Sequence, residues 1–277
     1  MPLFDFTDYG LLLQLVMPSL AVALVLGVLG GLLSTVVVHR DSSFAVHGIS
    51  ELSFAGAAIF LLIGLDVVLG AVTGSMLAAL IIGVVSGRAR NRNSITAVLM
   101  PFGLGLGILA LSLYPGRATS KFSLLTGSIV SIGDEKAITL LALSVVILIA
   151  LLLTWRRMLF ASVDPQVAQA RGVNLRVQSV LFMILLGLAI AVCIQVVGAL
   201  LVLSLLVTPA AAAMRVTSSQ FLGPLLAIIF AITAALGGTL ISLGSALPVS
   251  PFITTVSFMI YLVCFFIEKL QKRNANG

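Results

Sequence analysis

A stretch of 38 residues from Val177 to Met214 contains no charged side chain. As one straight helix it would be about 57 Å long, whereas the hydrocarbon core of a bilayer is about 30 Å thick. The stretch is therefore too long for a single membrane crossing, and the chain must break inside it. We expect that break at Gln195 and Gly198. A second uncharged stretch, from Phe221 to Ile267, is expected to break around Gly244 to Pro251.

The composition also indicates a chain that lies mostly in lipid. Hydrophobic residues make up 60% of the 277 residues and charged residues only 9%, against about 25% charged residues in an ordinary soluble domain. So few charges exclude a soluble enzyme, a disordered chain and a nucleic-acid-binding protein as descriptions of the whole chain. The two cysteines, Cys193 and Cys264, lie in apolar runs and form no disulfide or metal-binding motif.

Further apolar runs of membrane-spanning length precede the long uncharged stretches. They cover approximately residues 11–38, 44–64, 67–86, 95–114 and 137–154. The sequence therefore predicts an all-α polytopic membrane protein with about eight to nine transmembrane helices, in one transmembrane domain over residues 1–277. No internal repeat or second domain is evident.

The basic residues predict the orientation of the chain. Most of them alternate onto one side of the predicted spans, and on that side lie Arg40, Arg88, Arg90, Arg92, Arg156, Arg157, Arg171, Arg176, Arg215 and the tail 268–273. A minority, Arg117, Lys121 and Lys136, falls on the other side. Lys and Arg are enriched in cytoplasmic loops of membrane proteins. We therefore expect the N-terminus outside the cell and the C-terminus in the cytoplasm.

Glu51 is the costliest residue in the predicted spans, because an acid at mid-span costs about 2.5–3.5 kcal/mol on insertion scales. His47 lies four residues earlier, and this spacing places both side chains on one helix face. An imidazole nitrogen and a carboxylate oxygen one turn apart form a half-site for a divalent transition metal. The alternatives are an internal His–Glu hydrogen bond and a carboxylate that faces a wet cavity. Further ligands would come from another helix, from water or from a second copy of the chain.

A short segment after the fifth run carries signals for both ends of a helix. Asp164 suits the N-cap and Pro165 the first helical position, while Arg171 and Gly172 suit the C-terminal end. The pattern predicts a helix of about two turns in a cytoplasmic loop, which includes Ala168. Such order in a connecting loop indicates a docking element for a soluble partner, and the alternative is a loop helix that lies on the membrane surface.

The region from Gly198 to Ala213 combines Thr208 and Pro209 with four consecutive alanines. A proline frees a backbone carbonyl one turn earlier, and alanines permit close helix approach. The segment is interpreted as a gating or pathway-lining helix, with ordinary small-residue packing as the alternative. The chain has no glycine-rich nucleotide-binding loop and no serine or zinc protease motif. We therefore expect no enzyme activity in it, and an energy-using transporter would need its ATPase on another chain.

Taken together, these segments resemble the membrane permease subunit of bacterial ABC importers for manganese, zinc or iron. The resemblance covers nearly the whole chain and is carried by residues 47–56, 124–134, 164–173, 197–212 and 237–251. The family usually shows an Asp and a His where this chain has His47 and Glu51, so the order of carboxylate and imidazole is exchanged. Ala55 stands where the family has a proline.

The resemblance implies a multi-pass protein of the bacterial plasma membrane that works as a homodimer. It also implies cytoplasmic ATP-binding subunits that dock on Asp164, Pro165, Ala168, Arg171 and Gly172, and an extracytoplasmic metal-binding protein that delivers the ion. His47 and Glu51 would hold the metal transiently as substrate, with no permanently bound cofactor. Gly198, Thr208 and Pro209 would line or gate the pathway.

Two other transport functions remain open from the residues. A permease for chelated iron or a vitamin would need a wide pathway and no paired metal ligands. A proton-coupled secondary transporter would use Glu51 as a proton relay and would need no ATPase. The choice between zinc, manganese and iron also stays open, because His and Glu ligands suit all three metals.

Overall fold

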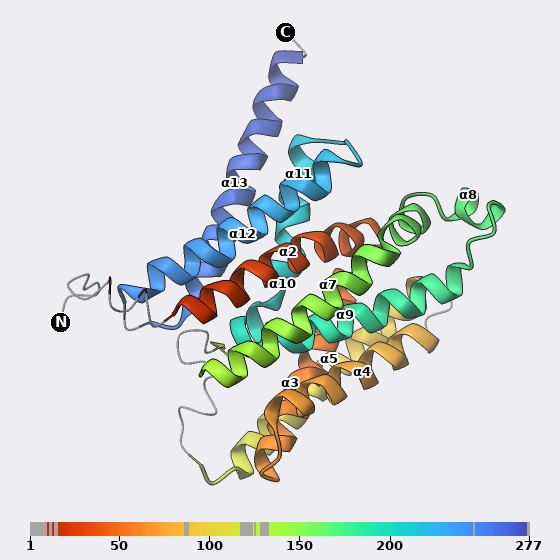
Figure 1. Cartoon of the computed structure of the whole chain (residues 1–277). Coiled ribbons are helices and arrows are strands. Elements are labelled where there is room, and N and C mark those ends of the chain that lie inside the picture. The colour runs from red at the N-terminus through yellow and green to blue at the C-terminus, as the bar shows by residue number, and fades with distance from the viewer. Residues whose placement is uncertain are drawn as a thin grey trace.

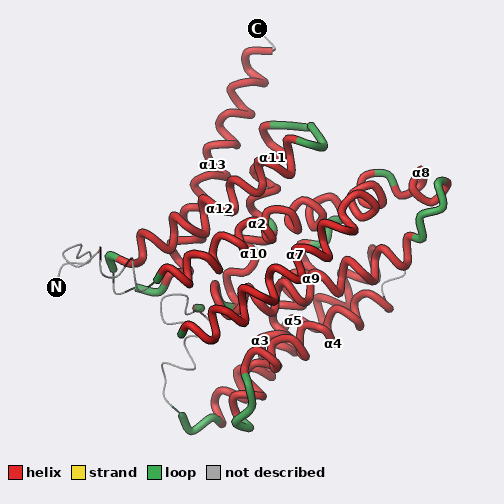
Figure 2. Tube along the Cα trace, viewed as in Figure 1, coloured by secondary structure: helices red, strands yellow, loops and turns green. Residues whose placement is uncertain are grey.

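The computed structural model describes residues 10, 13, 16–85, 89–116, 124, 126–127, 133–245 and 247–275. Throughout this part of the chain, every regular element is a helix (Figures 1 and 2). The elements are α2 (Met17–His39), α3 (Ser43–Leu62), α4 (Val67–Val85), α5 (Ala89–Leu113), α7 (Asp134–Val163), α8 (Pro165–Ala170), α9 (Leu175–Val197), η2 (Ala199–Leu201), α10 (Val202–Leu206), α11 (Thr208–Val216), α12 (Leu222–Leu243) and α13 (Val249–Ala275). Arg88 and most of the stretch 124–134 lie outside the described residues.

Eight of the described helices are long and apolar enough to cross a membrane, namely α2, α3, α4, α5, α7, α9, α12 and α13. This confirms the predicted all-α polytopic fold. Both predicted breaks are also confirmed: α9 ends at Val197, directly before Gly198, and residues 244–248 separate α12 from α13. Helix α7 continues to Val163, nine residues beyond the end of the predicted apolar run at residue 154, and it includes Arg156 and Arg157.

The segment η2–α10–α11 runs beside α13 in the same direction. Three contacts, each between residues 53 positions apart in sequence, join α13 to this segment and to Val197, the end of α9 directly before it. Ser250 Oγ donates to the Val197 carbonyl, Ser257 Oγ donates to the Ser204 carbonyl, and Arg215 pairs with Glu268. Residues 250 to 268 of α13 rise about 27 Å, so the broken segment covers about the thickness of the hydrocarbon core. It provides a ninth, interrupted crossing, within the predicted range of eight to nine.

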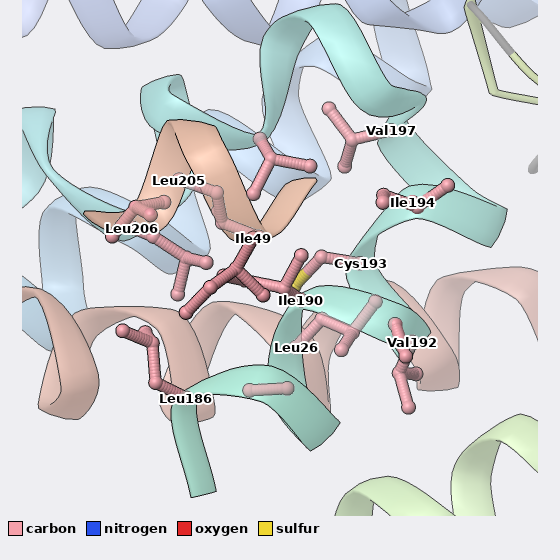
Figure 3. Close-up of a cluster of buried hydrophobic side chains, with 14 of the residues drawn as sticks. Leu26, Ile49, Leu186, Ile190, Val192, Cys193, Ile194, Val197, Leu205 and Leu206 are labelled. Carbon is pink, nitrogen blue, oxygen red and sulfur yellow. The ribbon is translucent and has the colours of Figure 1, made fainter. Parts of the chain in front are cut away.

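Helices α2 and α9 are the most buried of the long helices and occupy the centre of the bundle. Figure 3 shows their contact region, where Leu26 of α2 and Ile190 of α9 surround Ile49 of α3 together with Leu205 of α10. Glycines allow α2 to approach α12 closely, because a Cβ on Gly31 would lie 2.4 Å from the Ile228 Cα atom. Buried residues of α3 and of the broken segment thus belong to one apolar core together with α2 and α9.

Several basic residues gather at one end of the bundle. Arg40, after α2, bonds to Ser162 at the end of α7. His39 lines the same pocket as Ser219, in the loop that follows Arg215. The alternation predicted for these residues thus corresponds to a common end of the molecule, and α8 projects there from the α7–α9 pair (Figure 1). Which side of the membrane this end faces stays a prediction.

Candidate functional site

His47 and Glu51 lie one turn apart on α3, as predicted. His47 Nδ1 is 3.8 Å from Glu51 Oε1, which is too long for a hydrogen bond. The Glu51 side chain is 3% exposed and the His47 side chain 30%. His47 Nδ1 and Glu51 Oε2 are both buried, and neither has a hydrogen-bond partner in the described part of the chain. Buried polar atoms usually have partners, so this pair has the capacity to bind a cation.

Close packing fixes the orientation of α3. A Cβ on Gly103 of α5 would lie 2.9 Å from the Glu51 carbonyl carbon, and one on Gly74 of α4 would lie 2.2 Å from the Leu52 carbonyl oxygen. Ser53 Oγ also donates to the Ala71 carbonyl at 2.8 Å. Small residues let helix backbones approach closely in a membrane, where van der Waals contact and interhelical hydrogen bonds hold helices together. The rotation of α3, and with it the direction of Glu51, is set by these contacts.

An open pocket of 260 Å³ lies beside His47. It is lined by Ser43, Phe44, His47, Met100, Leu203, Val207 and Thr208. The fold therefore brings the predicted ligand His47 to Thr208, a residue predicted separately as part of the pathway. Met100 was not identified from the sequence, since a methionine in an apolar run carries no signal of its own. Glu51 is buried and is not among the residues that line this pocket.

The described residues of one copy do not by themselves form a complete metal site. Nowhere among them do three His, Cys, Asp or Glu side chains come together in an arrangement that could hold a metal ion. His47 and Glu51 can contribute one nitrogen and one or two oxygens, whereas divalent transition metals take four or more ligands. If this pair binds a metal, the other ligands would have to come from hydroxyls in the pocket, from water or from a second copy of the chain.

Gly198 breaks the chain where it was predicted to do so. Its φ of 85° and ψ of 158° lie in a region that is essentially restricted to glycine. Neighbouring carbonyls are freed from helical hydrogen bonding, and serines satisfy them. Ser50 Oγ of α3 donates to the Ala199 carbonyl at 2.8 Å, and Ser250 Oγ donates to the Val197 carbonyl at 2.5 Å and to the Thr126 carbonyl. None of these pairings was predicted, and the Ser50 contact joins α3, the helix of His47 and Glu51, directly to the break.

A second interruption lies at Val207, between α10 and α11. Val207 has a φ of −132° and a ψ of −53°, outside helical values, and Thr208 and Pro209 open α11. Pro209 is buried and has no amide hydrogen to donate into the preceding turn. The predicted effect of Pro209 on this segment is thus visible as a change of helix. Its role in gating stays a prediction.

Helix α8 has the predicted ends. The Asp164 side chain accepts from the Val167 amide at 3.0 Å, and Pro165 occupies the first turn. At the other end Gly172 has a φ of 81°, and the amides of Gly172 and Val173 donate to the carbonyls of Gln169 and Ala168. This pair of hydrogen bonds is a Schellman motif. It ends α8 and turns the chain into α9.

One residue anchors α8 and the others are available for contact. Ala168 is fully buried, whereas Arg171 is exposed and the Val167 side chain is 44% exposed. The small Ala168 side chain lets α8 lie against the ends of α7 and α9. The remaining surface of α8 is presented away from the bundle, as a docking element requires.

Comparison with known proteins decides the family. The profile of the ABC 3 transport family matches residues 12–268. This chain belongs to the ABC 3 transport family. It is a multi-pass protein of the plasma membrane and a transport component, not an enzyme, and the resemblance seen in the sequence is confirmed.

Relatives cover nearly the full length of this family member. It is 27% identical over 261 residues to the manganese import system permease protein ScaB of Streptococcus parasanguinis, which covers 94% of this chain and 92% of the relative. It is 24% identical over 256 residues to the high-affinity zinc uptake system membrane protein ZnuB of Haemophilus influenzae, covering 91% and 97%. Among solved structures, PsaBC from Streptococcus pneumoniae in complex with Fab matches with a TM-score of 0.83 and 26% identity, over 95% of this chain and 96% of that one.

Proposed function

We propose that this chain is the permease subunit of an ATP-driven importer that moves a divalent transition metal ion, manganese, zinc or iron, into the cell. The observation that carries the proposal is the pair His47 and Glu51. Both residues have buried polar atoms without a partner among the described residues, and His47 opens onto the pocket that contains Thr208. A carboxylate and an imidazole inside a membrane span indicate a functional site, because burying them costs free energy that packing alone does not return.

The names of the relatives support a metal ion as the substrate, since they include a manganese import permease and a zinc uptake protein. The ion is cargo and must leave the protein. A pathway conducts only if its sites bind weakly enough to release. Two ligands from one helix, completed by water or by weakly coordinating hydroxyl oxygens, form such a site.

The incomplete ligand set supports a homodimer. His47 lines an open pocket, and Phe44 beside it is 53% exposed. A second copy that faces this pocket would place another His47–Glu51 pair opposite the first and complete the coordination. Native mass spectrometry of the purified complex should show two permease copies. A complex with a single permease copy would refute the paired site.

Two further kinds of partner complete the proposed importer. Cytoplasmic ATP-binding subunits would dock on the exposed surface of α8, where Asp164, Pro165, Ala168, Arg171 and Gly172 define a capped and anchored helix. An extracytoplasmic binding protein would deliver the ion to the opposite end. ATP hydrolysis belongs to the docked subunits.

Metal uptake by cells tests the function and the site together. A strain that lacks this permease and related uptake systems is complemented with the wild type, with Glu51→Gln, with His47→Ala, or with the matched control Glu135→Gln. Glu135 is an exposed acid at the start of α7. Cell metal content is measured by mass spectrometry after metal-poor growth. Wild type and Glu135→Gln should restore one metal selectively, and the other two variants should not. Full uptake with Glu51→Gln would refute the site.

A further inference from the structure

We propose that Arg40 is a positioning residue that links the docking helix α8 to the metal-site helix α3. Arg40 follows α2 and reaches both chain segments that carry α8. Its Nε donates to Ser162 Oγ at 2.7 Å, near the end of α7. Its guanidinium carbon lies 4.9 Å from the centre of the Phe182 ring, on α9. One side chain therefore contacts the segment that enters α8 and the segment that leaves it.

The two contacts lie on the helices that precede and follow α8. Ser162 is two residues before Asp164, the N-cap of α8, and its hydroxyl also donates to the Met158 carbonyl at 2.5 Å. Phe182 is fully buried in the first half of α9. A planar guanidinium can donate along its edge and stack on an aromatic ring with its face at the same time. A displacement of α8 that moves its two supporting segments must therefore act on Arg40.

The backbone that follows Arg40 forms a stiff turn into α3. The amides of Asp41 and Ser42 donate to the carbonyls of Val38 and Val37 at 3.1 and 2.9 Å, the same Schellman pattern that ends α8. Asp41 adopts a left-handed φ of 49°, the one such value at a non-glycine residue in the described chain. Ser42 Oγ donates to the Arg40 carbonyl at 3.2 Å.

Helix α3 begins directly after this turn, with Val46 N donating to the Ser42 carbonyl at 3.1 Å. His47 is seven residues after Arg40, and the pocket beside it begins with Ser43 and Phe44. A short, hydrogen-bonded path of chain thus connects the docking helix to the metal ligand. An alternative role for Arg40 as a simple anchor of α2 predicts lost stability without any change in coupling.

The inference rests on the proposed function in one respect, that α8 receives the ATP-binding subunit. The decisive quantity is the number of metal ions moved per ATP hydrolysed, measured on the full complex in proteoliposomes. Arg40→Gln should lower this ratio about tenfold, within the range typical of coupling between distant sites, while ATP hydrolysis continues. Arg40→Lys keeps the charge without the planar fork and should lower the ratio less. The control Lys269→Gln, at an exposed position of α13, should leave it unchanged.

An unchanged ratio in Arg40→Gln, including one in which uptake and ATP hydrolysis fall in proportion, would overturn the proposal. Ser162→Ala removes the acceptor of the Arg40 Nε hydrogen bond together with a hydrogen bond inside α7 to the Met158 carbonyl, and it leaves the Arg40 side chain in place, so it tests the link if Arg40→Gln does not fold. It should lower the ratio in the same direction and by less than Arg40→Gln. An unchanged ratio in folded Ser162→Ala would also count against the link.

A distance measurement separates this proposal from the proposed function. Spin labels at Gln166 of α8 and Phe44 of α3, both exposed, report how rigidly the two helices are joined, whatever the cargo. The wild-type complex should give a narrow distance distribution with and without nucleotide, and Arg40→Gln should broaden it. An equally narrow distribution in the variant would contradict the link. If the wild-type complex moves none of the three metals and Arg40→Gln still broadens its distance distribution, the proposed cargo alone is refuted.

Discussion

The interrupted crossing η2–α10–α11 and the continuous helix α13 span the same depth side by side, yet they are built differently. Helix α13 satisfies its backbone internally and exposes large apolar side chains such as Phe258, Met259 and Val263. The interrupted segment is mostly buried and relies on other helices for its freed carbonyls. In lipid an unsatisfied backbone group is costly, so irregular backbone is tolerated only inside protein or beside a water-filled cavity. The interruption therefore identifies the side of the bundle where polar groups are shielded from lipid, and His47 lies on that side.

The largest effect is expected from removing the backbone freedom at the first interruption. Gly198→Ala places a Cβ at a φ of 85°, and such strained conformations cost about 1–3 kcal/mol in non-glycine residues. We expect a clearly lower midpoint of thermal unfolding in detergent and loss of uptake. The matched control is Gly237→Ala in α12, where an added Cβ would meet only Val256 Cγ1 at 3.9 Å. Equal unfolding midpoints for the two variants would contradict the assigned role of Gly198.

A smaller effect is expected from removing one side chain that supports the interruption. Ser250→Ala deletes the hydroxyl that donates to the Val197 and Thr126 carbonyls. A buried carbonyl left without its donor costs about 1–2 kcal/mol, the lower part of the usual range. Thr255→Ala is the control, because Thr255 is exposed and bonds only to the Pro251 carbonyl of its own helix. Thermal unfolding of both variants checks the difference, and a larger loss for Thr255→Ala would refute the pairing of the two segments at Ser250.

The smallest effect is expected at the other end of the paired segments. Arg215 bonds to Glu268 at 2.8 Å and to the Tyr261 hydroxyl, and its guanidinium lies over the Tyr261 and Phe265 rings. The side chains of Arg215 and Glu268 are 30% and 23% exposed, so water and salt weaken their attraction. Glu268 also keeps Lys272 as a partner at 2.6 Å. Arg215→Gln should lower the unfolding midpoint by less than Ser250→Ala.

A double-mutant cycle of Arg215→Gln with Glu268→Gln isolates the attraction between the two side chains. The coupling should decrease as salt concentration rises. Coupling that is independent of salt would show that packing on the two aromatic rings, and not the ion pair, joins α11 to α13.

The sequence predicted features that depend on local or one-dimensional rules. The uncharged stretch Val177–Met214 had to break because of its length, and Gly198 was the residue able to break it. Asp164 and Gly172 predicted both ends of α8, since caps act within a few residues of their own helix. The end of the apolar run at residue 154 did not mark the end of α7, because long Arg side chains can extend toward water from a helix that continues beyond its apolar run.

The candidate site was predicted only in part. Helical spacing placed His47 and Glu51 on one face, but it could not show that their facing atoms are 3.8 Å apart and that one polar atom of each is unpaired. Met100 was not predicted, because a methionine in an apolar run is common. Helical spacing also places Ser50 on the face of His47 and Glu51, but it could not show that Ser50 bonds to the Ala199 carbonyl. The roles of Gly198, Thr208 and Pro209 in the pathway stay predictions.

The sequence by itself determined the all-α polytopic class, the positions of the breaks and both ends of the capped helix α8, because bilayer thickness and backbone hydrogen bonding act along the chain. The tertiary structure alone decided that Thr208 shares a pocket with His47, that serines of α3 and α13 satisfy the carbonyls at the break, and that Arg40 holds both segments beside α8. Such contacts depend on the rotation and depth of each helix relative to its neighbours. Close packing at glycines sets these quantities, and hydropathy does not encode them.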